Sequence, residues 1–191
     1  MLTKKLYEKP KAKNLKIQLI IGTILCFTVI PIMQYFTELS GFPAQIFSSQ
    51  LSFNGDIMKS FYAVTNIELY RVAPLLDYIF MVGYGLILFS LSVLIARKYG
   101  LPSKLGQICL ITAVSGVIAA SCDGVENIFI LAMLTDPVGF PNYWAVSHSI
   151  FALIKWILLF ITITLVIIFG ILSLVRSKKK QNKSTKNLKP L

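Results

Sequence analysis

The chain contains, at residues 121–131, the stretch Ser121-Cys122-Asp123-Gly124-Val125-Glu126-Asn127-Ile128-Phe129-Ile130-Leu131. Two carboxyl groups and one side-chain amide lie here within a long apolar run. Inside a membrane, a carboxyl group costs several kcal/mol unless it finds water or a polar group to pair with. We therefore expect the chain to be organised around this stretch, and its Asp-x-x-Glu-Asn pattern is a functional-site hypothesis.

The composition of the whole chain is that of a membrane protein. Of 191 residues, 55% are hydrophobic and 14% are charged, and the mean hydropathy is +0.72, which is more apolar than a soluble domain needs. Four segments are long enough to cross a hydrocarbon core of ~30 Å, which takes about twenty helical residues. They are residues 17–36, 78–96, 105–134 and 148–175.

These lengths argue against a membrane barrel, whose strands are short and alternate in polarity. The predicted fold is an all-α, four-span transmembrane helical bundle, because each helix satisfies its own backbone groups in lipid. The predicted membrane domain covers residues 17–175, with an outer loop at 37–77.

The basic residues predict how the bundle is oriented. The net charge is +11, and most of the nineteen Lys and Arg residues flank the spans: six before the first, three between the second and third, and seven after the fourth. Because such a bias marks cytoplasmic segments, we expect residues 1–16 and 176–191 to be basic cytoplasmic tails of a plasma-membrane protein. The distribution argues against nucleic acid as a partner and favours contacts with anionic membrane lipids.

The loop at 37–77 is expected to contain a short outer amphipathic helix. Ser52 or Asn54 can cap a helix in which Ile57, Phe61 and Val64 recur at helical spacing. Such a helix would lie on the outer membrane face or over the end of the bundle. Two roles remain open for the segment, a packed connector or a lid over a ligand site.

One face of the third span consists of small residues at intervals of four, namely Thr112, Gly116, Ala120 and Gly124. Small residues let two helices approach closely, so this face should form the tightest seam of the bundle. The seam can lie within one chain or against a second copy. A homo-oligomer is therefore an open alternative.

The residue types that hold metals are sparse. The three cysteines are far apart and include no Cys-x-x-Cys, which argues against a disulfide framework or a metal cluster. His148 is the one histidine, so Asp123, Glu126 and His148 would make a weak site for zinc or iron. We therefore predict no metal and no cofactor.

The unusual polar residues of the four spans fall at one depth. Measured from the basic ends at ~1.5 Å per residue, Asp123 lies at ~28 Å, Asp77 at ~30 Å, Lys155 at ~31 Å and Gln34 at ~27 Å. Lys155 is the expected counter-ion of Asp123 or Glu126. This indicates a polar, water-accessible cavity between the midplane and the outer interface. The predicted ligand-binding residues are Asp77, Tyr84, Asp123, Glu126, Asn127, His148 and Lys155.

Three functions fit such a layer. The preferred one is the binding or transport of a lipid or small amphiphile. A second is a purely structural network of buried ion pairs that holds the helices in register within a subunit of a membrane assembly. The third is a lipid-modifying enzyme, in which Asp123 or Glu126 transfers a proton and Lys155 polarises the substrate.

Several motifs of this layer carry a resemblance to a known group. Asp77-Tyr78-Ile79-Phe80 is followed by Gly83-Tyr84-Gly85, then by Asp123-Gly124-Val125-Glu126-Asn127, and finally by Lys155-Trp156. From about Tyr70 to Trp156 the chain resembles uncharacterised bacterial four-helix membrane proteins, whose recurrent pattern is Asp-x-x-Phe-x-x-x-Tyr-Gly, Asp-x-x-Glu-Asn and Lys-Trp. The resemblance implies a four-helix membrane protein and implies no particular activity.

Overall fold

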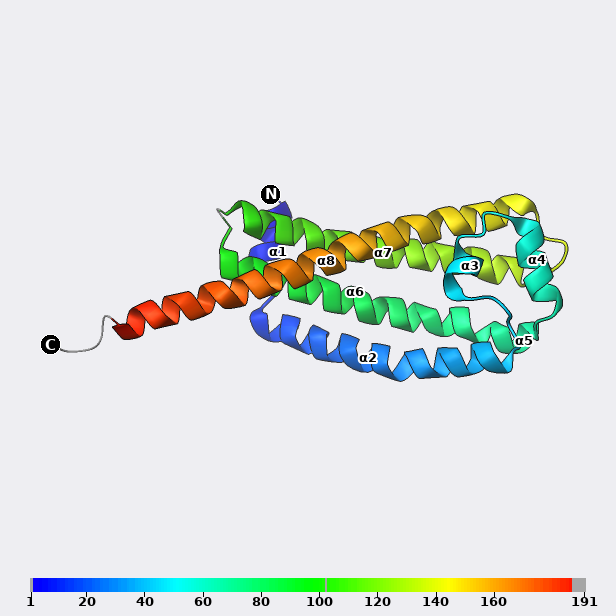
Figure 1. Ribbon diagram of the computed structural model, residues 1–191, viewed down its shortest axis with the longest axis horizontal. Helices are drawn as coiled ribbons and strands as arrows, with labels where there is room; N and C mark the ends of the chain where they lie inside the picture. The colour runs from blue at the N-terminus through cyan, green and yellow to red at the C-terminus, as the bar shows by residue number, and fades with distance from the viewer. Residues whose placement is uncertain (1, 102, 187–191) are drawn as a thin grey trace.

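The structure, a computed structural model, describes residues 2–101 and 103–186. Within these ranges the regular elements are all helices, and four of them are long enough and apolar enough to cross a membrane. The prediction of an all-α, four-span bundle is confirmed (Figure 1). The four long helices are α2 (Ala12–Leu39), α6 (Val72–Tyr99), α7 (Lys104–Met133) and α8 (Asn142–Lys186).

Each predicted span corresponds to one of these helices, but the helix bounds differ from the predicted ones. Pro74 lies in the first turn of α6, where N–H groups have no intrahelical acceptor and proline is tolerated. Because α6 begins at Val72, Asp77 lies in the second turn of this helix and not in the predicted loop at 37–77. The last helix, α8, continues to Lys186 and so runs through most of the predicted tail at 176–191. The remainder of that tail, residues 187–191, lies outside the described part of the chain.

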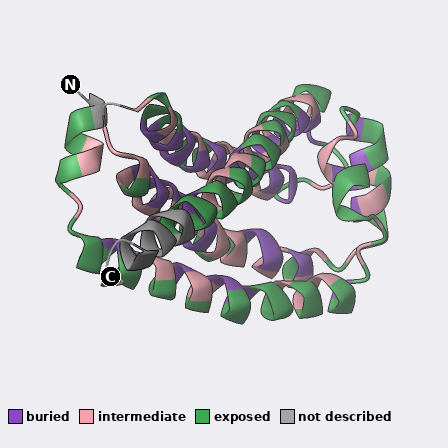
Figure 2. Ribbon diagram, turned by 60° about the vertical axis from the view of Figure 1, so that its left-hand side comes forward, coloured by how far each residue is buried: buried purple, intermediate pink, exposed green. Residues whose placement is uncertain are grey.

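The four long helices pack as neighbours in chain order. α6 packs along α2 on one side and along α7 on the other, and α8 packs along α7 with a smaller contact to α6. α2 and α8 make no extensive contact with each other, so this side of the bundle is open. Buried residues lie on the inward faces and exposed ones on the outward faces (Figure 2). The outward faces are themselves apolar, as expected for helices that face lipid.

Helices α2 and α6 approach each other closely at a pair of glycines, Gly22 and Gly83. A Cβ atom on Gly22 would lie 2.5 Å from the carbonyl oxygen of Gly83, and one on Gly83 would lie 2.8 Å from Cys26 Sγ. The small face of α7 packs within the chain, where a Cβ atom on Gly116 would lie 2.9 Å from Leu88 Cβ of α6. The backbones of α2 and α6 thus approach each other closely where their glycines meet, and the small face of α7 also packs tightly, against α6.

The outer segment between α2 and α6 contains three short helices. They are α3 (Ile46–Gln50), α4 (Gly55–Ala63) and α5 (Ile67–Tyr70), at the end of the bundle opposite the termini (Figure 1). Of the two predicted caps, Ser52 and Asn54, it is Asn54 that accepts two backbone N–H groups of the first turn of α4, at 2.8 and 3.3 Å. The predicted short outer helix is confirmed.

The residues that α4 buries against the bundle lie beside the predicted apolar stripe. Met58 and Tyr62 are buried in one cluster with Phe140 and Phe61 packs against that cluster, whereas Ile57 and Val64 are 41% and 68% exposed. Apolar residues occur on both sides of this helix, and its contact with α8 decides which side is covered. Burial raises the pKa of the Tyr62 phenol well above its ordinary value, so this group stays neutral beneath α4.

The predicted amino-terminal tail is also helical. A short helix, α1 (Leu2–Glu8), precedes the first span and packs against α6 and α7. Arg97 near the end of α6 donates to the carbonyl oxygen of Tyr7 at 2.8 and 3.0 Å, and also to that of Pro10. Its guanidinium group therefore holds the link between α1 and α2 against the basic end of the bundle.

Replacing Gly22 with alanine should destabilise the protein, although alanine favours a helix over glycine by about 1 kcal/mol. The added methyl group would meet a backbone carbonyl of α6, and overpacking of this kind costs about 1–3 kcal/mol. Thermal unfolding in detergent measures the effect. Gly170→Ala is the matched control, because its new methyl group would lie 3.6 Å from Ile95 Cδ1, at an ordinary contact distance. Equal melting temperatures for the two variants would contradict the close packing.

Candidate functional site

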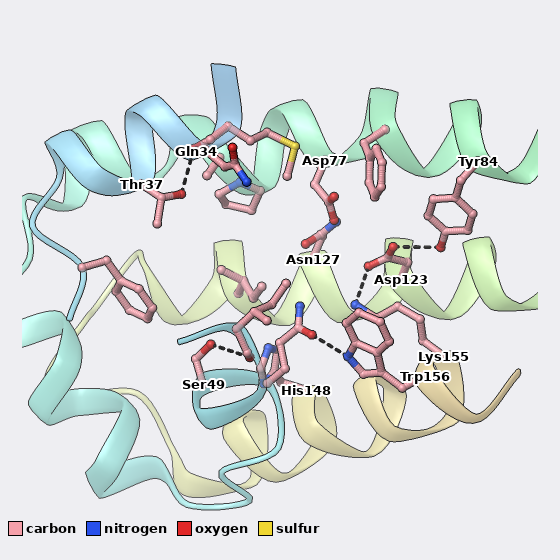
Figure 3. Close-up of a pocket in the computed structure, with 18 of the residues that line it drawn as sticks. Gln34, Thr37, Ser49, Asp77, Tyr84, Asp123, Asn127, His148, Lys155 and Trp156 are labelled. Atoms are coloured by element: carbon pink, nitrogen blue, oxygen red, sulfur yellow. Dashed lines mark hydrogen bonds and ion pairs between the residues drawn. The ribbon is translucent and has the colours of Figure 1, made fainter. Parts of the chain in front are cut away.

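The polar layer is centred on Lys155, a buried lysine of α8. Its Nζ atom lies 2.9 Å from Asp123 Oδ1 (Figure 3) and 2.6 Å from Glu126 Oε2, and both acids are on α7. The exposed fractions of Lys155, Asp123 and Glu126 are 3%, 3% and 0%. Their spacing of three residues puts both carboxyl groups on one face of α7, the face that meets α8. Lys155 is thus the counter-ion of both acids.

Two hydrogen bonds bring α6 into the layer. Tyr84 Oη donates to Asp123 Oδ2 at 2.8 Å, and Asn127 Nδ2 donates to Asp77 Oδ2 at 2.7 Å. Asp77 and Tyr84 are seven residues apart, an interval that puts them on one side of the helix. Three of the four spans are therefore joined in this layer by side-chain contacts.

Glu126 is fully buried and incompletely paired. Its Oε1 atom lies 3.4 Å from His148 Nε2, and neither of its oxygens accepts an aligned hydrogen bond from the described residues, although Oε2 is in contact with Lys155. His148 is 1% exposed, and its Nδ1 atom has no hydrogen-bond partner among the described residues. The histidine therefore belongs to the buried cluster and retains an unused nitrogen.

These side chains border a cavity of about 750 Å³ that lies between α2 and α8, over α6 and α7 (Figure 3). Six of the seven predicted ligand-binding residues line it, and Glu126 lies behind them. Gln34, predicted at the same depth, lines it from α2. The six residues are Asp77, Tyr84, Asp123, Asn127, His148 and Lys155.

The cavity also has an apolar arm that extends from the polar layer toward the termini. Ile87 and Leu88 of α6 and Leu159 and Ile163 of α8 line this arm. Ile163 follows Lys155 by eight residues, so the arm extends ~12 Å along α8. A cavity with polar groups in one part and an apolar arm beside them has the shape and chemistry of an amphiphile.

Trp156 and Gln50 also belong to the site, although sequence reasoning did not select them. Trp156 Nε1 donates to Gln50 Oε1 at 2.7 Å, and the Trp156 ring lies 4.7 Å from that of Phe47. These contacts hold α3 against α8 at the edge of the cavity, which is the position that a lid would occupy. Trp156 could have been selected from the sequence, because this residue directly follows Lys155 in the Lys-Trp pair. Gln50 lies in a helix of only five residues, and no sequence pattern marks it.

Within residues 2–101 and 103–186, no group of three His, Cys, Asp or Glu side chains is arranged to hold a metal ion. Asp123, Glu126 and His148 meet around Lys155, whose ammonium group lies in contact with both carboxyl groups. The ammonium group of Lys155 thus lies between the two carboxyl groups, where a metal site would place a metal ion.

No protein-family model, curated protein or solved structure matches this chain. The fold and the site define the class of protein: a helical protein with four candidate membrane spans and a buried lysine–carboxylate cluster beside an amphipathic cavity.

Replacing Lys155 with methionine should destabilise the protein by about 3–5 kcal/mol, because two carboxyl groups would stay buried without their counter-ion. Thermal unfolding in detergent measures the loss. Lys59→Met is the matched control, since Lys59 is half-buried and lies 3.7 Å from Asp56, whose side chain is exposed. Ion pairs that are open to solvent contribute about 0–1 kcal/mol, so this variant should lose much less stability.

Adding Asp123→Asn to Lys155→Met should restore part of the lost stability, because it removes one of the unpaired charges. The same unfolding measurement decides the matter. A double variant whose loss equals the sum of the two single losses would show that the two side chains do not stabilise each other directly.

Proposed function

We propose that the protein binds a membrane lipid or a small amphiphile, with the head at the polar layer and the alkyl chain in the apolar arm. The observation that carries this proposal is the cavity of about 750 Å³, whose lining combines buried polar groups with aliphatic side chains. Pockets of ~300–1,000 Å³ enclose most of the surface of a small ligand. A structural network alone would leave this volume without a role.

The open side of the bundle supports the same proposal. α2 and α8 make no extensive contact, and the cavity lies between them. A lipid chain in the surrounding bilayer can therefore approach the cavity sideways, without crossing water. The exposed apolar faces of both helices are compatible with such a surrounding.

A purely structural role is the alternative that a specific observation favours. Lys155, Asp123 and Glu126 join α8 to α7, as a network that fixes helix register would do. That role needs the ion pairs and makes no use of the cavity. Filling the cavity while leaving the ion pairs intact therefore separates the two functions.

Leu159→Trp should abolish the co-purification of a bound lipid, because the indole would fill the apolar arm next to the polar layer. Native mass spectrometry of the detergent-purified protein measures the bound lipid. Ile157→Trp is the matched control, since Ile157 lies on the same helix, is exposed, and does not line the cavity. Lipid retained by Leu159→Trp at the level of the control would argue for the structural alternative.

We also propose that the protein lies in the plasma membrane with both termini in the cytoplasm and the cavity in the outer half. The flanking basic residues support this orientation. Helices α3 and α4 lie at the end of the bundle opposite the termini (Figure 1). In this orientation they would face the outside of the cell.

A cysteine in place of Val64, an exposed residue that follows α4, tests the orientation. It should react with a membrane-impermeant maleimide in intact cells, with the unaltered protein as background. Protection in intact cells, with labelling only after lysis, would reverse the orientation.

Kinship with the bacterial four-helix membrane proteins described above is likewise a proposal. The residues that carry the resemblance lie far apart in the sequence and meet in one layer of the structure. This convergence supports treating the three parts of the pattern as one site.

A further inference from the structure

We infer that the head group of the bound amphiphile is cationic, and that Asp77 receives its ammonium group. This inference rests on the proposed amphiphile binding and names the chemical class of the ligand. It follows from the charge balance of the layer, from an unused oxygen of Asp77, and from the engagement of most of the cavity's hydrogen-bond donors.

The layer holds more carboxyl groups than cationic groups. The three carboxyl groups of Asp77, Asp123 and Glu126 stand against the ammonium group of Lys155. Lys155 is shared by two of the acids, and Asp77 contacts no cationic side chain among the described residues. A cationic ligand beside Asp77 would restore the balance, and the attraction is strong in a medium of low dielectric constant.

Asp77 also has an unused oxygen. Its Oδ2 atom accepts the hydrogen bond from Asn127 at 2.7 Å, whereas Oδ1 accepts none from the described residues. The side chain is half-buried and lines the cavity, projecting from α6 toward Asn127 (Figure 3). An ammonium group can donate to this oxygen without displacing any hydrogen bond of the protein.

His148 lies beside the same cavity on α8 and is almost completely buried. Its Nδ1 atom has no hydrogen-bond partner in the described part of the chain, and it is closed off from the surface of the cavity. Its Nε2 atom lies 3.4 Å from Glu126 Oε1 without an aligned hydrogen bond. Asp77 is therefore the acceptor that a head group in the cavity meets directly.

Most donor side chains of the cavity are already engaged within the protein. Six of the donor side chains that line it donate to a protein oxygen, whereas Gln34, Gln50 and Tyr70 donate no hydrogen bond among the described residues. At Asp77 an anionic head group would meet negative charge, whereas an ammonium group meets a complementary oxygen. The engaged donors are Thr37, Ser49, Tyr84, Asn127, Lys155 and Trp156.

Aromatic rings next to Asp77 suit the same ligand. Phe80 follows Asp77 by one turn of α6, and both Phe80 and Tyr70 line the cavity. The face of an aromatic ring attracts an ammonium group within about 6 Å. The rings therefore favour an ammonium head over a neutral hydroxyl of similar size.

The test compares dodecylamine, dodecanol and dodecanoate, which share one alkyl chain and differ in the charge of the head. Binding to the full-length, delipidated protein in dodecyl maltoside is titrated by native mass spectrometry. Dodecylamine should bind at least about tenfold more tightly than the other two. In Asp77→Asn this preference should fall by about tenfold, while dodecanol binding stays unchanged and shows that the site is folded.

Asp56→Asn is the matched control, because it removes the same charge from the exposed surface of α4 and should leave the preference for the amine intact. Should Asp77→Asn fail to fold, the ranking of the three probes on the unaltered protein decides. Butylamine, which has the head group without the long chain, should bind far more weakly than dodecylamine. Equal affinities for the two amines would overturn an amphiphilic ligand in favour of a small soluble amine.

Equal binding of the three dodecyl probes, or a preference for dodecanoate, would overturn the cationic head and leave amphiphile binding intact. Failure of every probe to bind, together with the absence of a co-purifying lipid, would refute the proposed function itself. Binding of the amine that survives both Asp77→Asn and Leu159→Trp would mark adsorption elsewhere on the protein and would also overturn the inference.

Discussion

The buried ammonium group of Lys155 is the constraint on which the rest of the structure depends. A lysine within apolar spans is stable there because Asp123 and Glu126 lie within contact distance of it. The three side chains fix the rotation and height of α8 relative to α7, since a slip of one residue would turn a carboxyl group away by about 100°. Tyr84 extends the constraint to α6 through its hydrogen bond to Asp123.

The first span is outside this network, and the cavity follows from that. α2 packs against α6 through Gly22 and Gly83, in the half of α2 nearer the amino terminus. Gln34 lies twelve residues further along, ~18 Å from Gly22, and here α2 lines the cavity without packing on α8. Because α2 is held by close packing in one half and makes no ion pair in the other, a cavity remains between its outer half and the polar side chains of α6, α7 and α8.

Much of this arrangement could be predicted, because hydropathy and helical periodicity are local properties of the sequence. The four spans follow from segment length, and the shared depth of Asp77, Asp123 and Lys155 follows from counting along each helix. The remainder depends on contacts between distant segments. Apolar residues on both sides of α4 gave no basis for choosing its buried face, and the bond from Trp156 to Gln50 joins α8 to a helix too short to show a period.

Structural and ligand-binding roles can coexist in this layer because they fall to different carboxyl groups. Asp123 and Glu126 are committed to Lys155, and changing their contacts would disturb the packing of α7 on α8. Asp77 is hydrogen-bonded to Asn127 alone among the described residues, so it can receive a ligand without breaking an ion pair. The ion pairs thus hold the polar wall of the cavity in place before a ligand arrives, and binding to such a preorganised wall avoids the free-energy cost of reordering it.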